Sequence, residues 1–500
     1  MANYVGIDLG TTFSVAAYID ESGRPTIIDP RSPDDKPRRD DNLTPSCVTK
    51  NRVGEFARNQ WGSDKENVAA RFKRDMGTSK TRKVGGKDFS PTELSAAVLK
   101  KIKEDAEKKI GPVTEAVVTI PANFSQEARE ATMNAALLAG LNIKYIINEP
   151  TAAALYYAYQ SDRRLTGTYV VFDLGGGTFD VSVIKLKGQD VEVVASNGIH
   201  ELGGMDFDEC LWSLIASKYR DDTGDELSDK VFSINDAEEE KKSLSNKKRT
   251  TADIRRELID VSRLEFEECI STLIAQIEMM CEAVLDEANI RPDEITSVFL
   301  AGGSTRMPCV VECAKKVFKQ EPISTVNVDE VVALGACLYA AYKSDRTNLS
   351  EIQKKSISKL KLQEVTNAYF GTIAVGESES KGKDMQNSII IKKGQTIPCS
   401  VTEKYYTIHE GQEAIRCRIT ESKSPETNPK FVKIIHDEEL PLPPNRPAGQ
   451  ELKITYKYDE NQMMHAKFKD ISSGREASVK ISMIKEGSTT ESEIDKFLVE

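Results

Sequence analysis

Pairs of short apolar runs joined by a glycine-containing turn occur twice in the first 200 residues of the chain. Residues 169–172 and 181–184 are two such runs of β-branched and aromatic residues, and Asp-Leu-Gly-Gly-Gly-Thr-Phe-Asp stands between them. Two strand-like segments around a glycine-dense turn predict a β-hairpin. Three consecutive glycines also let backbone N–H groups approach an anion, because no Cβ is in the way. We expect this turn to bind phosphate; the alternative is a tight turn with two solvated carboxylates.

The same plan occurs near the N-terminus. Residues 4–19 run from a strand through an Asp-Leu-Gly-Thr-Thr turn into another strand, and Asp8 precedes Asp173 by 165 residues. Residues 298–308 again lead from a strand through Gly-Gly toward a helix. The repetition predicts a duplicated element whose two turns grip opposite sides of one phosphate chain. The carboxylates of Asp173 and Asp180, which flank the glycine turn, can hold a hydrated divalent metal through oxygen ligands.

Helix signals alternate with these strands. Ser90, followed by proline and then by Glu93, is a helix start with a capping serine. Residues 262–288 have the apolar period of one long amphipathic helix. Glu149 follows a strand-like run and precedes a helical one, so its carboxylate can point into a cleft and orient water. Its alternative role is to cap the helix that begins at Thr151.

The apolar period changes to two beyond Val365. Residues 452–458 and 479–483 alternate apolar and polar side chains, with turn residues between the runs. This pattern predicts an antiparallel β-sandwich of about eight strands. Residues 343–361 contain six basic residues, two acids and few apolar ones, a composition typical of a linker. We therefore expect a first domain at 1–343, a linker at 344–364 and a β-sandwich at 365–500.

Composition excludes several classes of protein. A net charge of −11 argues against non-specific binding to nucleic acid. The chain has no basic-then-apolar N-terminal signal, and the apolar run at 331–342 is too short to span a bilayer, so a cytoplasmic protein without a membrane segment is expected. Nine cysteines without a CxxC pair fit reduced thiols. The P-loop, GxSxG and HExxH motifs do not occur.

Five motifs, in the family's order, resemble the DnaK-type chaperones, the seventy-kilodalton heat-shock protein family within the superfamily of actin and the sugar kinases. The motifs stand at residues 4–19, 148–155, 173–180, 202–208 and 298–308. The resemblance implies an α/β fold with a two-lobed, actin-like ATPase domain made of duplicated ribonuclease-H-like halves, followed by the β-sandwich. It also implies a helical lid after the sandwich, for which the chain up to Glu500 leaves no room.

The resemblance implies an ATP hydrolase that uses Mg²⁺, with K⁺ as a further candidate cation. It implies a metal site at Asp8, Asp173 and Asp180, and catalytic roles for Asp173, Thr178, Lys73 and Glu149. Read without the family, Lys73 is one solvated lysine in a basic cluster. The implied contacts to ATP or ADP are Gly10, Thr11, Thr12, Phe13, Lys73, Gly175, Gly176, Gly177, Thr178, Gly203, Gly204, Glu238, Lys241, Lys242, Ser245, Gly302, Gly303, Ser304, Arg306 and Asp329.

Three departures from the family pattern bear on function. Phe13 stands where many relatives carry tyrosine or asparagine, and it has no group to hydrogen-bond to phosphate or ion, so a weak effect of K⁺ is expected. The chain between Gly77 and Ser90 is shorter than in typical members, which predicts a trimmed tip where exchange factors often bind. The linker is basic where the family has an acidic, leucine-rich one, which puts the coupling between domains in doubt.

The resemblance implies an ATP-driven chaperone of the stress response that binds unfolded or extended polypeptides, with a J-domain co-chaperone and a nucleotide-exchange factor as partners. By family register Ile415 and Cys417 would line the peptide pocket, with Tyr369 and Phe370 nearby; the alternative is that these are ordinary core positions. Two other functions stay open. One is an adaptor that binds ATP without a client cycle, and the other is a small-molecule kinase or an actin-like protein.

Overall fold

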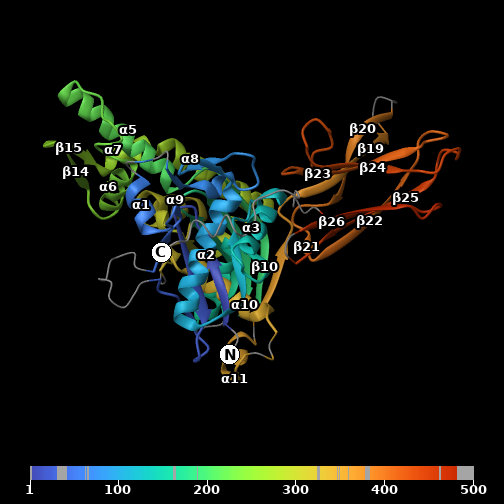
Figure 1. Cartoon of the computed structure of the whole chain (residues 1–500), viewed down its shortest axis with the longest axis horizontal. Coiled ribbons are helices and arrows are strands. Elements are labelled where there is room, and N and C mark those ends of the chain that lie inside the picture. Colours follow the sequence, from blue (N-terminus) through green and yellow to red (C-terminus); the bar gives the residue numbers. More distant parts are fainter. Residues whose placement is uncertain are drawn as a thin grey trace. The chain divides into compact units, whose positions relative to one another are not determined.

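The computed structural model of the chain (Figure 1) divides into two compact units, which are described separately. The described residues up to Leu362 form the first unit, and those from Gln363 onward form the second. Residues 481 and 483, which were expected in a strand, lie outside the described residues. The structure describes residues 3–30, 42–61, 64, 67–161, 165–188, 190–323, 327–345, 347, 349–358, 360–377, 383–460 and 463–480.

Two sheets of the first unit share one pairing pattern. The first sheet has the strand order β10-β9-β1-β2-β3, and the second contains the order β17-β16-β11-β12-β13. In each sheet three strands run as an antiparallel meander, and two later strands add in parallel beside the first. The strands of the first sheet are β1 (Asn3–Asp8), β2 (Phe13–Ile19), β3 (Pro25–Ile27), β9 (Val113–Ile120) and β10 (Ile143–Asn148). Those of the second are β11 (Thr166–Leu174), β12 (Phe179–Lys187), β13 (Asp190–Ile199), β16 (Ile295–Ala301) and β17 (Pro322–Ile323).

Helices fill the space between the two sheets and cover their outer faces. α10 packs on the first sheet, α4 packs on the second, and the two helices pack against each other. We call the first sheet with its helices the first lobe, and the second sheet with its helices the second lobe. The helices of the unit are α1 (Glu55–Trp61), α2 (Pro91–Ile110), α3 (Gln126–Leu138), α4 (Glu149–Gln160), α5 (Gly204–Thr223), α6 (Ile234–Asn246), α7 (Arg263–Cys269), α8 (Ser271–Ala288), α9 (Pro308–Phe318), α10 (Val331–Lys343) and α11 (Glu351–Ile357).

Shorter elements complete the unit. β4 (Thr44–Pro45) pairs with β2. Three further antiparallel pairs are β5 (Cys47–Thr49) with β6 (Val68–Ala70), β7 (Arg82–Val84) with β8 (Lys87–Phe89), and β14 (Arg249–Ile254) with β15 (Glu257–Ser262). The 3₁₀ turns are η1 (Phe72–Asp75), η2 (Pro292–Glu294) and η3 (Gly303–Arg306). The predicted start of α2 is present: the Ser90 hydroxyl accepts from the Glu93 amide, and the Glu93 carboxylate accepts from the Ser90 amide.

Residues 262–288 form two helices instead of the single one that the apolar period predicted. The break falls at Ile270, whose φ of −93° and ψ of 5° leave the helical region, so that α7 ends and α8 begins there. Ile270 is fully buried. Apolar residues of both helices face the core, and Ile270 between them is buried as well. The apolar period therefore does not reveal that the chain leaves the helical conformation at Ile270.

The segment expected to be a linker, residues 344–364, carries an ordered helix. Ser350 caps α11, and the Gln353 side chain donates to the carbonyl of Ile19 at 3.0 Å, tying the helix to the first lobe. Ile357 and Leu360 are buried. Composition alone does not reveal the helix, because the helix rests on a capping serine and a few buried apolar contacts, while Ile352 stays exposed.

The second unit contains two four-stranded antiparallel sheets, with orders β20-β19-β23-β24 and β22-β25-β26-β27. Side chains from both sheets enter one hydrophobic core, which includes Phe370, Cys417, Tyr456 and Phe468. The strands are β18 (Lys361–Val365), which spans the boundary of the units, β19 (Tyr369–Glu377), β20 (Lys383–Ile391), β21 (Thr396–Ile397), β22 (Cys399–Tyr406), β23 (Ala414–Ser422), β24 (Lys433–Pro441), β25 (Glu451–Tyr458), β26 (Met464–Asp470) and β27 (Glu476–Lys480).

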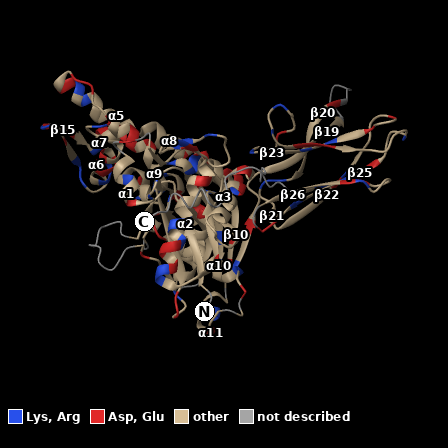
Figure 2. Ribbon diagram, viewed as in Figure 1, with Lys and Arg blue, Asp and Glu red and all other residues tan. Residues whose placement is uncertain are grey.

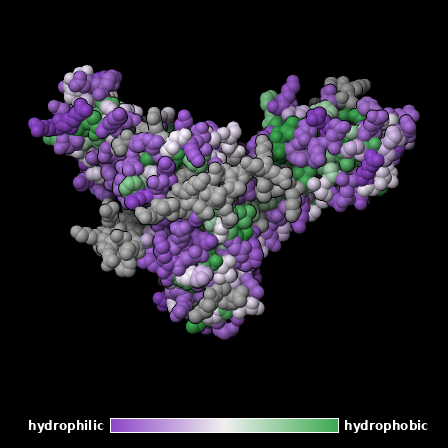
Figure 3. Space-filling view, in the orientation of Figure 1, coloured by the Kyte–Doolittle hydropathy of each residue, from purple (hydrophilic) through white to green (hydrophobic). Residues whose placement is uncertain are grey.

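The surface is polar over most of both units. Figure 2 shows Lys and Arg interspersed with Asp and Glu along the ribbon. Figure 3 shows hydrophobic patches among hydrophilic residues on the second unit, where Phe431 is 72% exposed. Across the described residues, none of the helices has the length and apolar character needed to cross a bilayer.

An aromatic stack ties α4 to the second sheet, and its loss should destabilise the first unit. The Phe299 ring on β16 lies 4.2 Å from that of Tyr157 and 4.9 Å from that of Tyr169, nearly parallel to both. We expect Phe299→Ala to lower the free energy of unfolding by about 3–5 kcal/mol, since it leaves a buried cavity. Urea titration followed by tryptophan fluorescence measures this, because both tryptophans lie in the first unit. Phe56→Ala, an exposed phenylalanine of the same unit, is the control; an equal effect of both changes would contradict the assignment.

Candidate functional site

A cleft of about 1260 Å³ opens in the first unit where β1 and β11 end. Its walls come from both lobes: the turns after β1 and β11, the segment of η1, the start of α4, helix α6 and the turn after β16. β1 and β10 run in the same direction in one sheet, as do β11 and β16 in the other, so the residues that follow their carboxyl ends meet at this place.

The two hairpin turns face each other across the cleft. A Cβ atom at Gly176 would lie 2.0 Å from Thr12 Oγ1, and one at Gly177 would lie 2.5 Å from Thr11. Glycine is therefore required at both positions by the close approach of the opposite turn. The buried Oγ1 of Thr12 has no hydrogen-bond partner among the described residues, so a donor or acceptor from a ligand would complete its bonding.

The glycine turn presents its amides toward the cleft. Three successive carbonyl oxygens each accept a hydrogen bond from outside the turn: Gly175 from the Gly204 amide (2.9 Å), Gly176 from the Met205 amide (2.8 Å) and Gly177 from Arg74 Nε (2.7 Å). In a trans peptide the N–H points opposite to the carbonyl. The N–H groups that follow these carbonyls are therefore directed away from the anchors, and such successive amides make an anion-binding concavity.

Three buried carboxylates lie beside these turns. Asp173 and Asp180 are directly paired across β11 and β12, and Asp8 accepts a hydrogen bond from Thr119 at 3.0 Å. Burial, together with the charge of Glu149, raises the pKa of Asp8 to about 7 and that of Asp180 to about 8, and raises the pKa of Asp173 well above its usual range. Desolvation is the larger cause, and the like charge of Glu149 adds to it, while the nearby Lys73 ammonium acts in the opposite direction.

A hydrated divalent cation fits this donor set. Within the described residues no three His, Cys, Asp or Glu side chains converge closely enough to coordinate one ion directly, so contact through water is the arrangement that the geometry favours. Both polar atoms of the buried Asn123 amide have no partner among the described residues, and Asn123 lies beside Asp180. Hard oxygen donors and room for water are what Mg²⁺ prefers.

Lys73 and Glu149 form an ion pair next to the carboxylates. The Lys73 ammonium lies 2.5 Å from Glu149 Oε1, and both side chains are buried. Lys73 is held by η1, whose Phe72 packs in the core of the first lobe, while Glu149 is the first residue of α4. The pair places one cation and one carboxylate beside the glycine turn in the cleft.

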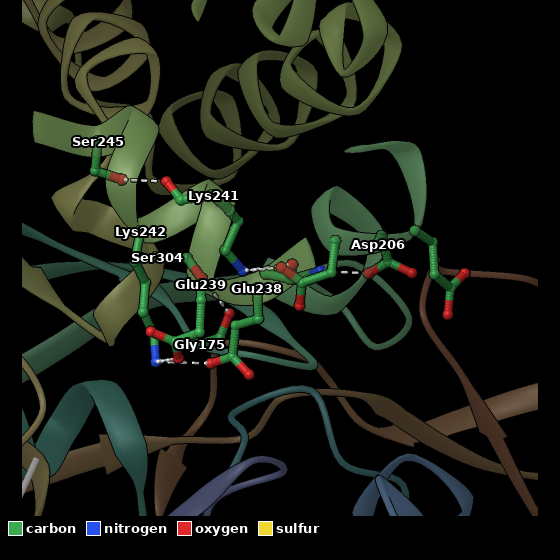
Figure 4. A network of polar contacts seen from close by, with 12 residues as sticks. Gly175, Asp206, Glu238, Glu239, Lys241, Lys242, Ser245 and Ser304 are labelled. Carbon is green, nitrogen blue, oxygen red and sulfur yellow. Dashed lines mark hydrogen bonds and ion pairs between the residues drawn. The ribbon is translucent and has the colours of Figure 1, made fainter. Parts of the chain in front are cut away.

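Helix α6 supplies one side of the cleft far from these carboxylates (Figure 4). The Lys242 ammonium lies between the carboxylates of Glu238 and Glu239, at 3.2 and 2.9 Å. Lys241 is directed inward, 2.6 Å from Asp208 and 2.8 Å from the carbonyl of Gly204. The Ser245 hydroxyl donates to the carbonyl of Lys241. All four predicted positions on α6 line the cleft, but each side chain already bonds to a protein group in this structure.

The turn after β16 forms the opposite wall. The Arg306 guanidinium donates to Asp329 at 2.6 Å and to Asn327 at 2.8 Å, and Ser304 donates to the carbonyl of Gly175 at 3.0 Å. The turn after β16 is thus bonded directly to the glycine turn after β11.

The structure brings nearly all the sequence-predicted site residues into this one cleft. Two do not line it: Asp180 lies buried behind Asp173, and Gly203 packs flat on the peptide of Gly176 and Gly177. Sequence reasoning missed Arg58, whose guanidinium lies 4.7 Å from the centre of the Phe13 ring and 2.8 Å from Glu238. No local pattern marks Arg58, since its partners are distant in the chain.

A mixed α/β unit with a cleft lined from two sheets of equal strand pairing is consistent with the class of actin-like ATPase folds. The family model described as Hsp70 protein matches residues 4–85 and 80–500, and the chain therefore belongs to the Hsp70 family. The family resemblance expected from the five motifs is confirmed. At the level of the family, this is an ATP-binding chaperone class whose members are ATPases, bind ATP or ADP with Mg²⁺ and act on polypeptides with co-chaperones.

Binding of Mg²⁺ should release protons near neutral pH. Asp8 and Asp180, with pKa values of about 7 and 8, are partly protonated in the cation-free protein, and a cation favours their ionised forms. We expect the apparent affinity for Mg²⁺ with ADP to rise from about pH 6 to about pH 8. Isothermal titration calorimetry in buffers of different ionisation enthalpy measures the released protons.

The same pKa shifts set the sign of a stability effect. A carboxyl whose folded pKa exceeds the unfolded value of about 4 costs stability as pH rises through that interval. Asp180→Asn should therefore raise Tm in Mg²⁺-free buffer at about pH 8, whereas the exposed control Asp88→Asn should leave it unchanged. An unchanged Tm for Asp180→Asn together with pH-independent Mg²⁺ binding would contradict the electrostatic account.

Proposed function

We propose that this protein is an ATP-hydrolysing, DnaK-like chaperone that binds unfolded or extended polypeptide segments. The observation that carries the proposal is the Lys73–Glu149 ion pair, at 2.5 Å, beside two phosphate-binding turns and three buried carboxylates in one cleft. A kinase of the same superfamily needs the same cleft but has no evident use for the second unit. That unit favours the chaperone.

The mechanism that we infer is direct in-line attack of water on the terminal phosphate, without a phospho-enzyme. Glu149 orients the water, and Lys73 offsets the charge that develops on the phosphate oxygens. The amides of the 175–178 turn and the hydroxyls of Thr11 and Thr12 hold the phosphates. A hydrated Mg²⁺ near Asp8, Asp173 and Asp180 would neutralise phosphate charge, with K⁺ as a further cation.

The adenosine end of ATP is assigned to the second lobe. Glu238, Lys241 and Ser245 on α6 are proposed to contact adenine and ribose, and Arg306 is proposed to stack from the opposite side. Support comes from the common cleft that all four line. The mutual hydrogen bonds on α6 would exchange for bonds to the ligand.

Lys73→Ala should abolish turnover while ADP still binds. Removing a positioned electrostatic group typically costs ~100-fold or more in rate, and the amides and α6 stay in place. Single-turnover hydrolysis of ATP and titration of ADP measure the two properties. Lys87→Ala, an exposed lysine on β8, is the matched control. Normal turnover of Lys73→Ala would remove Lys73 from the mechanism.

We further infer that the halves of the first unit are duplicated ribonuclease-H-like folds and that the second unit is the family's substrate-binding β-sandwich. Equal strand pairing in the two lobes supports the first inference, and the common core of two four-stranded sheets supports the second. The proposed domains are 1–343 and 365–500, with a cytoplasmic location, a J-domain co-chaperone and an exchange factor as partners.

One observation favours the adaptor as a second candidate. Cys417 and Phe370, expected at the peptide pocket, are 0% and 1% exposed and belong to the core of the second unit. Ile415 is only partly buried and packs against that core. With these side chains turned inward, a client would be held mainly by main-chain hydrogen bonds at a sheet edge.

Peptide release should therefore be fast with either nucleotide. Affinity differences among related complexes arise mostly in the off-rate, and a ligand shifts an equilibrium only by its differential affinity. Dissociation of a fluorescent apolar peptide, measured with ADP and with ATP, tests this. Slow release with ADP and a large acceleration by ATP would reveal a working clamp. No binding of any unfolded peptide would support the adaptor.

A further inference from the structure

Arg74 reaches from the first lobe to the phosphate turn of the second. Its Nε donates to the carbonyl of Gly177 at 2.7 Å, and its two Nη atoms lie 3.1 and 2.5 Å from the two carboxylate oxygens of Asp206. Asp206 in turn accepts from the amide of Gly203 at 2.7 Å. One guanidinium thus holds the turn and the beginning of α5 together.

Arg74 differs from the other anchors of this turn. The carbonyls of Gly175 and Gly176 are held by backbone amides of the second lobe itself. The carbonyl of Gly177 is held by a side chain from η1, one residue after Lys73. Because the Gly177–Thr178 peptide is planar, fixing its carbonyl also fixes the direction of the Thr178 N–H.

Arg74 is itself held in place. Its two Nη atoms form a bidentate ion pair with the two carboxylate oxygens of Asp206. This geometry restricts the guanidinium to one plane. The ring of His200 lies with Nε2 2.6 Å from the Arg74 carbonyl. Both partners of the Arg74–Asp206 pair are largely shielded from water, with side chains 15% and 21% exposed, so the pair is screened less than a surface ion pair.

We propose that Arg74 is a positioning residue that aims the Thr178 N–H at the terminal phosphate. It also fixes the distance between this N–H and Lys73. Arg74 touches neither nucleotide nor water in this role; it acts through the Gly177–Thr178 peptide. The proposal rests on the proposed ATPase function, since it assigns the terminal phosphate to this end of the cleft. A planar guanidinium is needed because one donor must reach Gly177 while two others engage Asp206.

The test compares Arg74→Gln, Arg74→Lys and Asp206→Asn in the full-length protein. We expect Arg74→Gln to lower the single-turnover rate of ATP hydrolysis about 10-fold or more, since small misplacements of catalytic groups cost that much, while the Kd for ADP changes less than about threefold. Arg74→Lys should recover little. Asp206→Asn should show a smaller loss, and the double variant should lose no more than Arg74→Gln, because the two residues act as one unit.

Arg82→Gln is the matched control. Arg82 also bonds to a buried carboxylate, that of Asp75 at 2.6 Å, in the same segment of the first lobe, but it has no hydrogen bond to the turn among the described residues. Its hydrolysis rate should stay within about twofold of the wild type. Two results for Arg74→Gln would overturn the positioning role. One is an unchanged hydrolysis rate, and the other is a slower rate accompanied by a comparable fold-loss of ADP affinity and a lower Tm.

A binding measurement separates this proposal from the proposed function. The ratio of the Kd values for ADP and for a non-hydrolysable ATP analogue reports the contribution of the terminal phosphate, whether or not the protein hydrolyses ATP. We expect Arg74→Gln to reduce any preference for the analogue about 10-fold, in keeping with one lost hydrogen bond to a charged group. An unchanged ratio would overturn the role of Arg74 even if the wild type proves to be an ATPase. A wild type without hydrolysis but with a ratio that depends on Arg74 would refute only the ATPase.

Discussion

The close approach of two hairpin turns is the constraint on which the cleft depends. Thr11 and Thr12 of one turn pack where Cβ atoms would stand at Gly176 and Gly177 of the other. The sheets that carry these turns are separated by α4 and α10, which pack against each other. Without glycine at the contact the lobes would have to separate, and the amides of one turn would no longer face the hydroxyls of the other.

Buried carboxyl groups outnumber cationic side chains at this contact, which favours binding of a cation. Asp8, Asp173 and Asp180 are buried with raised pKa values because burial and the charge of Glu149 disfavour their ionised forms. One cation, Lys73, stands against the four carboxyls of Glu149, Asp8, Asp173 and Asp180, and it only partly offsets their repulsion. Ionising the three aspartates in the absence of a cation costs stability, and such strongly shifted groups in a cleft are typical of functional sites.

Local pattern was sufficient to predict an element where the residues of a short segment determine its conformation by themselves. The Ser90 cap, the glycine turn at 175–178 and the alternating strand at 452–458 all appear in the structure as expected. Pattern was insufficient where burial decides. Ile270 interrupts the single helix that the apolar period predicted. The segment proposed as a linker contains the helix α11, and Cys417 is buried in the core, one of the two positions that the sequence left open for it.

The sequence by itself determined the motifs, their order and hence the Hsp70 family, together with most of the predicted residues that line the cleft, because each motif is a contiguous run with its own chemistry. Only the tertiary structure decided which side chains bond to which. The pairs Arg74–Asp206 and Arg58–Glu238 join residues more than 130 positions apart. Such contacts depend on how the lobes pack, and packing is a property of the whole fold that no local spacing encodes.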